Sequence, residues 1–246
     1  MRSISRRWKI ISVIFITAFI LMLWFGSALI NNRRDNTNTT PIPAKTPSPS
    51  PIAKVVIDPG HGGYDAGASG KLTGTPESKI NLTISQFVKE FLEKENVNVT
   101  LTRNNNEALA SKKKDDMKIR RSIMHDTGAD LTVSIHMNMF RDTSIYGPMV
   151  FYTIGDAPSK ILADSILNSV CEKLDMRKRL TNPGDYYVIR NSSIPAVIIE
   201  CGFLSNPEEE KKLCNNDYQK LMAKAISDGI LIYINKYIVS SSDTIN

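Results

Sequence analysis

The 246-residue chain is poor in cysteine and histidine, with three of each. Cys171, Cys201 and Cys214 form no CxxC pair, and so few cysteines exclude the dense disulfide framework of small secreted domains. We expect free, buried thiols rather than the single disulfide that three cysteines would allow, with Cys201 in the core. Because histidine is scarce, the position of each histidine is informative.

The predicted folded part also lacks an excess of charge. Residues 1–53 hold seven of the 31 Lys and Arg residues and one of the 25 Asp and Glu residues, which leaves 24 of each sign in the rest of the chain. A neutral domain has no electrostatic footprint for nucleic acid. The chain has no Gly-x-Ser-x-Gly elbow, phosphate-binding loop or internal repeat, so no other catalytic motif competes for the active site.

One long uncharged segment is present, from residue 10 to residue 30. It matches the roughly 20 apolar residues that cross a bilayer and exceeds the roughly 7–15 of a signal-peptide core. We therefore predict a cytoplasmic basic tail (1–9), an uncleaved transmembrane signal anchor (10–30) and a disordered linker (31–53) rich in Pro, Ser, Thr and Asn. Cleavage of the segment, with Gly26-Ser27-Ala28 as a weak site, is the alternative.

From residue 54 onward, apolar runs of strand length alternate with segments of helical periodicity. The expected strands are 54–57, 98–102, 131–136, 149–152, 186–190 and 196–200, and the expected helices are 78–95, 115–127, 158–174 and 219–237. This order predicts a single α/β domain over 54–238, with a twisted, mostly parallel β-sheet flanked by helices on both faces. Residues 239–246 are expected to be a flexible tail.

Three of the expected strands end in side chains suited to metal binding or acid–base chemistry. His61 follows the first strand within Asp58-Pro-Gly-His-Gly-Gly, His136 ends the 131–136 strand, and Glu200 ends the 196–200 strand. The carboxyl ends of parallel strands meet at one edge of a sheet, where α/β proteins place their sites. We therefore expect His61 and His136 to bind a metal. The alternatives are that His61 is only a turn residue and that His136 is only a core residue at a strand end. His125 is expected at the surface of a helix.

Two glutamates could complete such a site. Glu77, 16 residues after His61, is the best placed third ligand for zinc, although the helix dipole alone favours a glutamate in a first turn. Glu200 follows four apolar residues, and a buried carboxylate needs a partner such as a metal ion, a water on that metal, or Arg190. A carboxylate beside the metal that is not a ligand can act as a general base.

These residues stand in motifs that resemble the zinc-dependent N-acetylmuramoyl-L-alanine amidases of type 3. The motifs are DPGHGGYDAG at 58–67, ESKINL at 77–82, SIHMN at 134–138 and PAVIIECGFLSN at 195–206. The resemblance implies one zinc ion held by His61, Glu77 and His136, with Glu200 as the catalytic acid/base. It also implies hydrolysis of the amide between the lactyl group of N-acetylmuramic acid and the L-alanine of a stem peptide. Asn138 and Arg190 are candidates for the substrate groove, or ordinary polar residues at strand ends.

The arrangement of segments along the chain indicates which subgroup of these amidases it resembles. Only ten residues separate His136 from Gly147, too few for the inhibitory helix that some cell-division amidases carry there, and no wall-binding repeats flank the domain. The chain is thus similar to the membrane-anchored CwlD-type amidases of spore-forming bacteria. This likeness implies action on cortex peptidoglycan outside the cytoplasmic membrane, as the first step toward muramic-δ-lactam. An activating protein partner of unknown identity is also considered.

Two other functions are weighed against the amidase. One is a zinc peptidase that cleaves within the stem peptide, since similar metal sites serve different substrates. The other is a non-catalytic wall-binding protein with a disabled site. The residues at 61, 77, 136 and 200 argue against it, because all four can bind a metal or transfer a proton.

Overall fold

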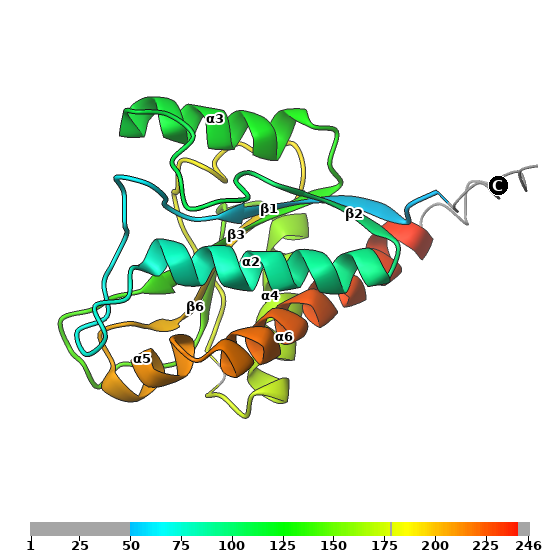
Figure 1. Cartoon of the computed structure of the whole chain (residues 1–246). Helices are drawn as coiled ribbons and strands as arrows, with labels where there is room; N and C mark the ends of the chain where they lie inside the picture. The colour runs from blue at the N-terminus through cyan, green and yellow to red at the C-terminus, as the bar shows by residue number, and fades with distance from the viewer. Residues whose placement is uncertain (1–49, 178, 241–246) are drawn as a thin grey trace, which may run out of the picture. The chain divides into compact units, whose positions relative to one another are not determined.

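The computed structural model describes residues 50–177 and 179–240 (Figure 1). The predicted basic tail, the signal anchor and the linker up to residue 49 lie outside the described residues, as do residues 241–246 of the predicted flexible tail. Within the described ranges, no helix combines the length and the apolar content that crossing a bilayer requires. The first strand begins at Ala53 and the last helical turn ends at Val239, while the domain boundaries at residues 54 and 238 stay a prediction.

The described residues form one six-stranded sheet and its helices. The strands are β1 (Ala53–Pro59), β2 (Val97–Leu101), β3 (Leu131–Asn138), β4 (Met149–Tyr152), β5 (Asn182–Pro183) and β6 (Ala196–Phe203). The helices are α2 (Glu77–Lys94), α3 (Lys113–Asp126), α4 (Ala157–Lys173), α5 (Pro207–Leu213), α6 (Asn216–Ile234) and a π-helical turn η1 (Asn235–Val239). The strand order is β2-β1-β3-β6-β4-β5.

The sheet is mostly parallel, as predicted. β1 pairs in parallel with both β2 and β3, β3 pairs in parallel with β6, and only the pairing of β4 with β6 is antiparallel. The carboxyl ends of β1, β3 and β6 therefore lie at the same edge of the sheet. This edge is where the sequence places His61, His136 and Glu200.

Helices cover both faces of the sheet (Figure 1). Helices α2, α4 and α6 pack on one face, where Val55 and Ile57 of β1 join the larger apolar core. Helix α3 lies on the other face, and Val56 of β1 packs there with Met124 of α3. Alternate residues of a strand point to opposite faces, so the unbroken apolar run of β1 is the pattern of a strand buried on both sides.

One predicted strand, 186–190, is wrong. These residues form a turn in which the carbonyl oxygen of Tyr186 accepts hydrogen bonds from the backbone N–H groups of Ile189 (3.1 Å) and Arg190 (2.9 Å). Hydrogen bonds within the turn take the place of the hydrogen bonds that a strand would make to a neighbouring strand. The aromatic and β-branched residues of 186–190 favour a strand only by propensity. The two-residue strand β5 pairs with β4 instead.

Helix α5 is absent from the sequence-based prediction. Its start signal is nevertheless present, because the Asn206 side chain accepts hydrogen bonds from the N–H groups of Glu208 and Glu209, and Pro207 occupies the first helical turn. Asparagine before proline is the usual composition of a helix N-terminus. The helix is only seven residues long, too short for its apolar periodicity to be recognised.

Candidate metal centre and active site

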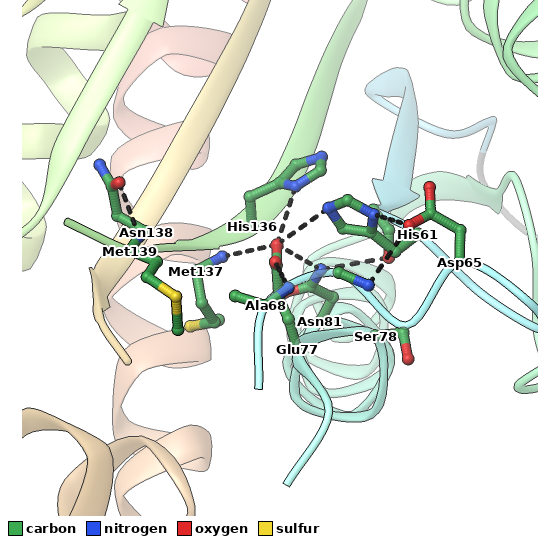
Figure 2. Close-up of polar contacts among 12 residues, drawn as sticks. His61, Asp65, Ala68, Glu77, Ser78, Asn81, His136, Met137, Asn138 and Met139 are labelled. Carbon is green, nitrogen blue, oxygen red and sulfur yellow. Dashed lines mark hydrogen bonds and ion pairs between the residues drawn. The ribbon is translucent and has the colours of Figure 1, made fainter. Parts of the chain in front are cut away.

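Three predicted ligands meet at the carboxyl edge of the sheet. His61 lies in the loop after β1, Glu77 is the first residue of α2, and His136 lies near the end of β3. β1 and β3 are neighbours in register, with Pro59 opposite Ile135, so the two histidines leave the sheet side by side. One nitrogen of each imidazole and one carboxylate oxygen of Glu77 all lie within 4.8 Å of one another (Figure 2).

Glu77 is the centre of this cluster. Its Oε1 lies 3.3 Å from Nε2 of His61 and 3.0 Å from Nδ1 of His136, and it accepts a hydrogen bond from the N–H of Met137 (3.1 Å). Its Oε2 accepts a hydrogen bond from the N–H of Ala68 (2.8 Å). Burial raises the pKa of Glu77, but the hydrogen bonds from His136 and His61 outweigh it and hold the pKa far below its ordinary value. Glu77 is therefore an ionised carboxylate aimed at two imidazoles.

His61 is held on its second side by another carboxylate. Its Nδ1 lies 2.9 Å from Oδ1 of Asp65, while its Nε2 faces Glu77. A carboxylate on the far nitrogen fixes the tautomer and the ring orientation of a metal-binding histidine. Lys113 continues the chain of charges, with its Nζ 3.2 Å from Oδ2 of Asp65.

His136 is fixed by close packing. A Cβ on Gly60 would lie 2.2 Å from Cε1 of the His136 ring, so only glycine leaves room for the imidazole. The ring of His61 meets it edge-on, with 4.9 Å between centroids. Burial lowers the pKa of His136, but the hydrogen bond to Glu77 and the charges of Glu200 and Glu77 outweigh burial and raise it above its ordinary value.

Glu200 stands beside the cluster without joining it. β6 pairs with β3 so that Glu200 lies directly opposite His136, and its side chain lines the same cavity as His61 and His136. Its Oε2 is buried and has no hydrogen-bond partner among the described residues. Burial raises the pKa of Glu200, and the nearby charge of Glu77 adds to this rise against the opposing effect of His136. A carboxylate in this state is suited to accept a proton from a water molecule.

Cys201, the next residue, is fully buried on the opposite face of β6 and packs in the larger core. Burial raises the pKa of its thiol well above the ordinary value. Cys201 and Cys214 form no disulfide among the described residues, and Cys201 is a core residue as predicted.

The cluster opens into a cavity of about 240 Å³. One wall is helix α3, which contributes Lys113, Met117 and Arg120, and the other wall is the turn at residues 186–188. The two walls are joined, since Arg121 of α3 donates to the carbonyl oxygen of Tyr187 (2.6 Å) and Nε2 of His125 lies 2.7 Å from the carbonyl oxygen of Val188. His125, expected at the surface, is thus partly buried against this turn.

The donor set fits zinc. Two imidazole nitrogens and one carboxylate oxygen are the protein ligands of many catalytic zinc sites, in which the fourth position is left for water or substrate. The unpartnered oxygen of Glu200 in the same cavity agrees with this fit, because a buried polar atom without a partner is costly unless water, metal or substrate completes it.

The two candidate substrate residues lie elsewhere. Asn138 donates to Sδ of Met149 (3.7 Å), and its Oδ1 accepts from the N–H of Met139. Arg190 pairs with Asp185, with 2.8 Å between Nη2 and Oδ2, so its carboxylate partner is not Glu200. Among the described residues that line the cavity, neither Asn138 nor Arg190 is included. Their contact with substrate stays a prediction.

Sequence reasoning missed several residues of the cavity wall. Tyr186 and Tyr187 line the cavity, and the only signal for them was an aromatic pair that the sequence also allowed in a strand. Met117 lies within the helix predicted over 115–127 and Lys113 two residues before it, and no local pattern marked either residue as part of a cavity wall.

The comparisons with known proteins agree with this geometry. Residues 55–231 match the N-acetylmuramoyl-L-alanine amidase family. The germination-specific N-acetylmuramoyl-L-alanine amidase of Bacillus subtilis is 29% identical over 233 residues, which cover 90% of this chain and 94% of that protein. The amidase LytC of B. subtilis is 33% identical over 181 residues, 73% of this chain and 35% of that protein.

Solved structures extend the likeness to the fold. The CwlD amidase of Clostridioides difficile, solved in complex with the GerS lipoprotein, is 34% identical with a TM-score of 0.71, covering 74% of this chain and 98% of that one. The catalytic domain of CwlV from Bacillus (Paenibacillus) polymyxa is 32% identical with a TM-score of 0.68, covering 74% and 98%. The match of motif, fold and site shows that this chain belongs to the N-acetylmuramoyl-L-alanine amidase family.

Proposed function

We propose that this peptidoglycan amidase is zinc-dependent, that His61, Glu77 and His136 hold its metal ion, and that Glu200 is its general acid/base. The observation that carries the proposal is the convergence of three ligand atoms within 4.8 Å of one another, beside a buried carboxylate oxygen that has no partner among the described residues. When bound, a zinc ion supplies a Lewis acid that polarises the scissile carbonyl and lowers the pKa of a water molecule.

Other residues of the chain orient the three proposed ligands. Asp65 orients His61, the Met137 and Ala68 N–H groups orient Glu77, and Gly60 leaves the space in which His136 stands. These contacts hold the ligands in place before substrate arrives, so the site reorganises little during reaction.

Glu200 moves the proton. It accepts a proton from the water that attacks the lactyl carbonyl carbon and then donates that proton to the nitrogen of the departing L-alanine. The C–N bond breaks, and the products are a lactyl carboxylate on muramic acid and a stem peptide with a free amino terminus. Burial raises the pKa of Glu200 above its ordinary value, which makes this carboxylate a better proton acceptor than an exposed glutamate.

The test is product analysis with the full-length chain in detergent and purified peptidoglycan. We expect stem peptides that begin with L-alanine, lost with EDTA and restored by zinc. Glu200→Gln should lower kcat by about 10²–10⁴-fold with zinc content unchanged. Glu208→Gln, on an exposed side chain of α5, is the matched control. Cleavage within the stem peptide would move the chain to the zinc peptidases, and an active Glu200→Gln variant would remove Glu200 from its role.

We infer further that the substrate is spore cortex peptidoglycan, where the reaction begins muramic-δ-lactam formation. The germination-specific relative from B. subtilis and the CwlD likeness support this inference. Deleting the gene in the host should give spores whose cortex lacks muramic-δ-lactam and which germinate poorly, with rescue by the wild-type gene and none by Glu200→Gln. Cortex of normal composition in the deletion strain would place the enzyme in the vegetative wall.

The location we propose is extracytoplasmic, with residues 10–30 as the membrane anchor. A wall substrate outside the membrane supports it, together with the uncharged run. Protease added to intact protoplasts should remove the catalytic domain and leave a short membrane-bound fragment. Protection of the domain until the protoplasts are lysed would contradict this orientation.

A protein partner is also proposed. The solved CwlD amidase is bound to a lipoprotein, which supports an extracytoplasmic activating partner for this chain. The measurement is zinc affinity and turnover of the full-length chain alone and after co-expression with candidate lipoproteins of the host. Full activity of the chain alone, unchanged by any candidate, would argue against such a partner.

A further inference from the structure

Arg103, just after β2, is a buried arginine with an unusual set of partners. Its side chain lies in the interior, and each of its four hydrogen bonds ends on a backbone carbonyl oxygen. The acceptors are Pro59 (2.9 Å, from Nε), Asn105 (2.7 Å, from Nη1), and Gly60 (2.9 Å) and Ser78 (2.8 Å), both from Nη2. A planar guanidinium with five N–H donors is the one side chain that can satisfy so many acceptors at once.

Three of these four carbonyls belong to two segments that carry proposed metal ligands. Pro59 and Gly60 immediately precede His61, and Ser78 immediately follows Glu77 in the first turn of α2. One guanidinium therefore ties the His61 loop to the Glu77 turn. Asn81 adds a second tie between the same segments, since its Nδ2 donates to the carbonyl oxygen of Gly60 (3.1 Å) and to Oε1 of Glu77 (3.2 Å).

The His61 loop needs such support because its backbone is strained. His61 has φ of 61°, in the left-handed region, and Gly62 and Gly63 follow at 138° and 58°. A non-glycine residue in this region costs about 1–2 kcal/mol and persists only where surrounding contacts impose it. The carbonyl oxygens of this loop turn into the protein, where without donors they would be buried and unpaired.

A second buried arginine makes the role of Arg103 clearer by contrast. Arg120 also donates to the loop, to the carbonyl oxygens of Pro59 (2.7 Å) and His61. However, it is itself paired with the carboxylates of Asp58 (2.8 Å) and Asp116 (2.7 Å). Arg120 anchors the loop to α3, whereas Arg103 donates to backbone carbonyl oxygens alone. Of the two arginines, Arg103 is the one that contacts the turn carrying Glu77.

We propose that Arg103 is a positioning residue of the metal centre, which sets the separation of His61 from Glu77 through the planar fork of its guanidinium rather than through its charge. The inference rests on the proposed metal site. Lysine keeps the charge, but its three N–H donors share one nitrogen atom, so it cannot reproduce the planar fork that reaches Pro59, Gly60 and Ser78 from separate nitrogens.

The experiment uses the full-length chain in detergent with Arg103→Lys, Arg103→Ala and Arg179→Met. Arg179 also donates to a backbone carbonyl, that of Tyr146 (2.6 Å), away from the metal ligands, so it is the matched control. Zinc dissociation constants are measured by chelator competition, and the visible spectrum of the cobalt-substituted protein reports ligand geometry. Unfolding of each variant in EDTA separates metal binding from general stability.

We expect Arg103→Lys to bind zinc about 10–100-fold more weakly, the usual effect of removing a residue that supports a metal ligand, with an altered cobalt spectrum. Methylguanidinium should restore part of the zinc affinity of Arg103→Ala, and Arg179→Met should bind zinc as the wild type does. Arg103→Lys with wild-type affinity and cobalt spectrum would overturn the inference. So would a loss of affinity that only follows the loss of folded protein in EDTA. A wild-type chain that binds neither metal would instead overturn the proposed metal site itself.

Discussion

Oε1 of Glu77 faces both histidines, the side-chain amide of Asn81 and a backbone N–H. A glutamate in the first turn of a helix is ordinarily explained by the helix dipole, but this carboxylate is buried and turned toward the sheet edge (Figure 2). Its hydrogen bonds with the imidazoles outweigh the cost of burial and keep it ionised. At the residue scale the site is thus built around one anchored oxygen.

Gly60 gives a steric test of the centre. In Gly60→Ala the added methyl would lie 2.2 Å from Cε1 of His136, so the ring must leave its position. We expect zinc affinity to fall at least about tenfold, as measured by chelator competition. Gly74→Ala is the control, because its added Cβ meets nothing within 4 Å although its φ of +67° makes it strained. Equal zinc affinity in Gly60→Ala and wild type would show that His136 is not a ligand.

Glu210 gives a pH-dependent test of stability. Burial raises its pKa, but hydrogen bonds from the N–H groups of Leu72 and Thr73 outweigh burial and hold the pKa below its ordinary value of 4.5. A lowered carboxyl pKa stabilises the fold above the ordinary value, and this contribution is lost as the pH falls through the lowered pKa. Glu210→Gln should therefore lower the free energy of unfolding by about 1–2 kcal/mol at neutral pH.

The difference between Glu210→Gln and wild type should shrink as the pH falls below about 4.5. Urea unfolding at neutral and acid pH measures it, with the exposed Glu208→Gln as control. A difference that is the same at both pH values would mean that the charge of Glu210 contributes nothing.

At the element scale, register decides the chemistry. β3 and β6 pair so that His136 and Glu200 stand opposite each other, and β1 pairs with β3 so that the His61 loop starts beside them. A slip of one residue in either pairing would send these side chains to the other face of the sheet. The apolar cores on both faces hold the register, so packing far from the site positions it.

Gly229 tests the packing of α6 on α4. Alanine is the better helix former by about 1 kcal/mol, which alone would make Gly229→Ala stabilising. However, the added Cβ would lie 2.6 Å from Cα of Ile166 and 2.9 Å from the carbonyl oxygen of Ser165. We expect the clash to prevail, with a net loss of about 1–3 kcal/mol in the free energy of unfolding.

The measurement for Gly229→Ala is urea unfolding, and Leu221→Ala on the exposed side of α6 is the control. A variant more stable than wild type would show that α4 and α6 can separate without cost, contrary to their close approach in this structure.

At the scale of the whole molecule, the sheet with its two helical layers carries the complete site. The candidate ligands, Glu200 and the cavity walls all lie between residues 58 and 200, while α6 closes the core behind them. Residues 54–246 hold 24 acidic and 24 basic residues, so contact with a wall polymer depends on the local shape and charge of the cavity rather than on a general field.

The catalytic domain should fold without the N-terminal segment. Residues 50–246 retain the first strand, whose predecessor Ile52 donates to the carbonyl oxygen of Asn96 (3.0 Å). We expect a monodisperse fragment that unfolds cooperatively and binds zinc as tightly as the full-length chain, measured by circular dichroism and chelator competition. Aggregation of this fragment, with a fragment from residue 31 remaining soluble, would place the domain boundary earlier in the chain.

The sequence by itself determined the mostly parallel sheet, the burial of Cys201, and the position of His61, His136 and Glu200 toward one edge of that sheet. Each depends on apolar periodicity and on Gly and Pro breaks, which are local properties of the chain. The sequence did not determine where the strands end, since β3 continues to Asn138 and β6 to Phe203. Glu77 is a weak candidate on local grounds, and the family resemblance makes it an expected ligand. The predicted strand at 186–190 failed because hydrogen bonds within a turn outweighed strand propensity there.

Only the tertiary structure decided which polar groups meet. Arg103 joins the carbonyl oxygens of Gly60 and Ser78, and Arg121 holds the turn at Tyr187, across separations that no periodicity records. The cavity wall beside Glu200 likewise forms only when α3 packs near the 186–188 turn. Apolar burial depends on the residue and its neighbours in the chain, whereas a buried hydrogen bond needs two groups at one distance and angle. The folded backbone alone supplies that geometry.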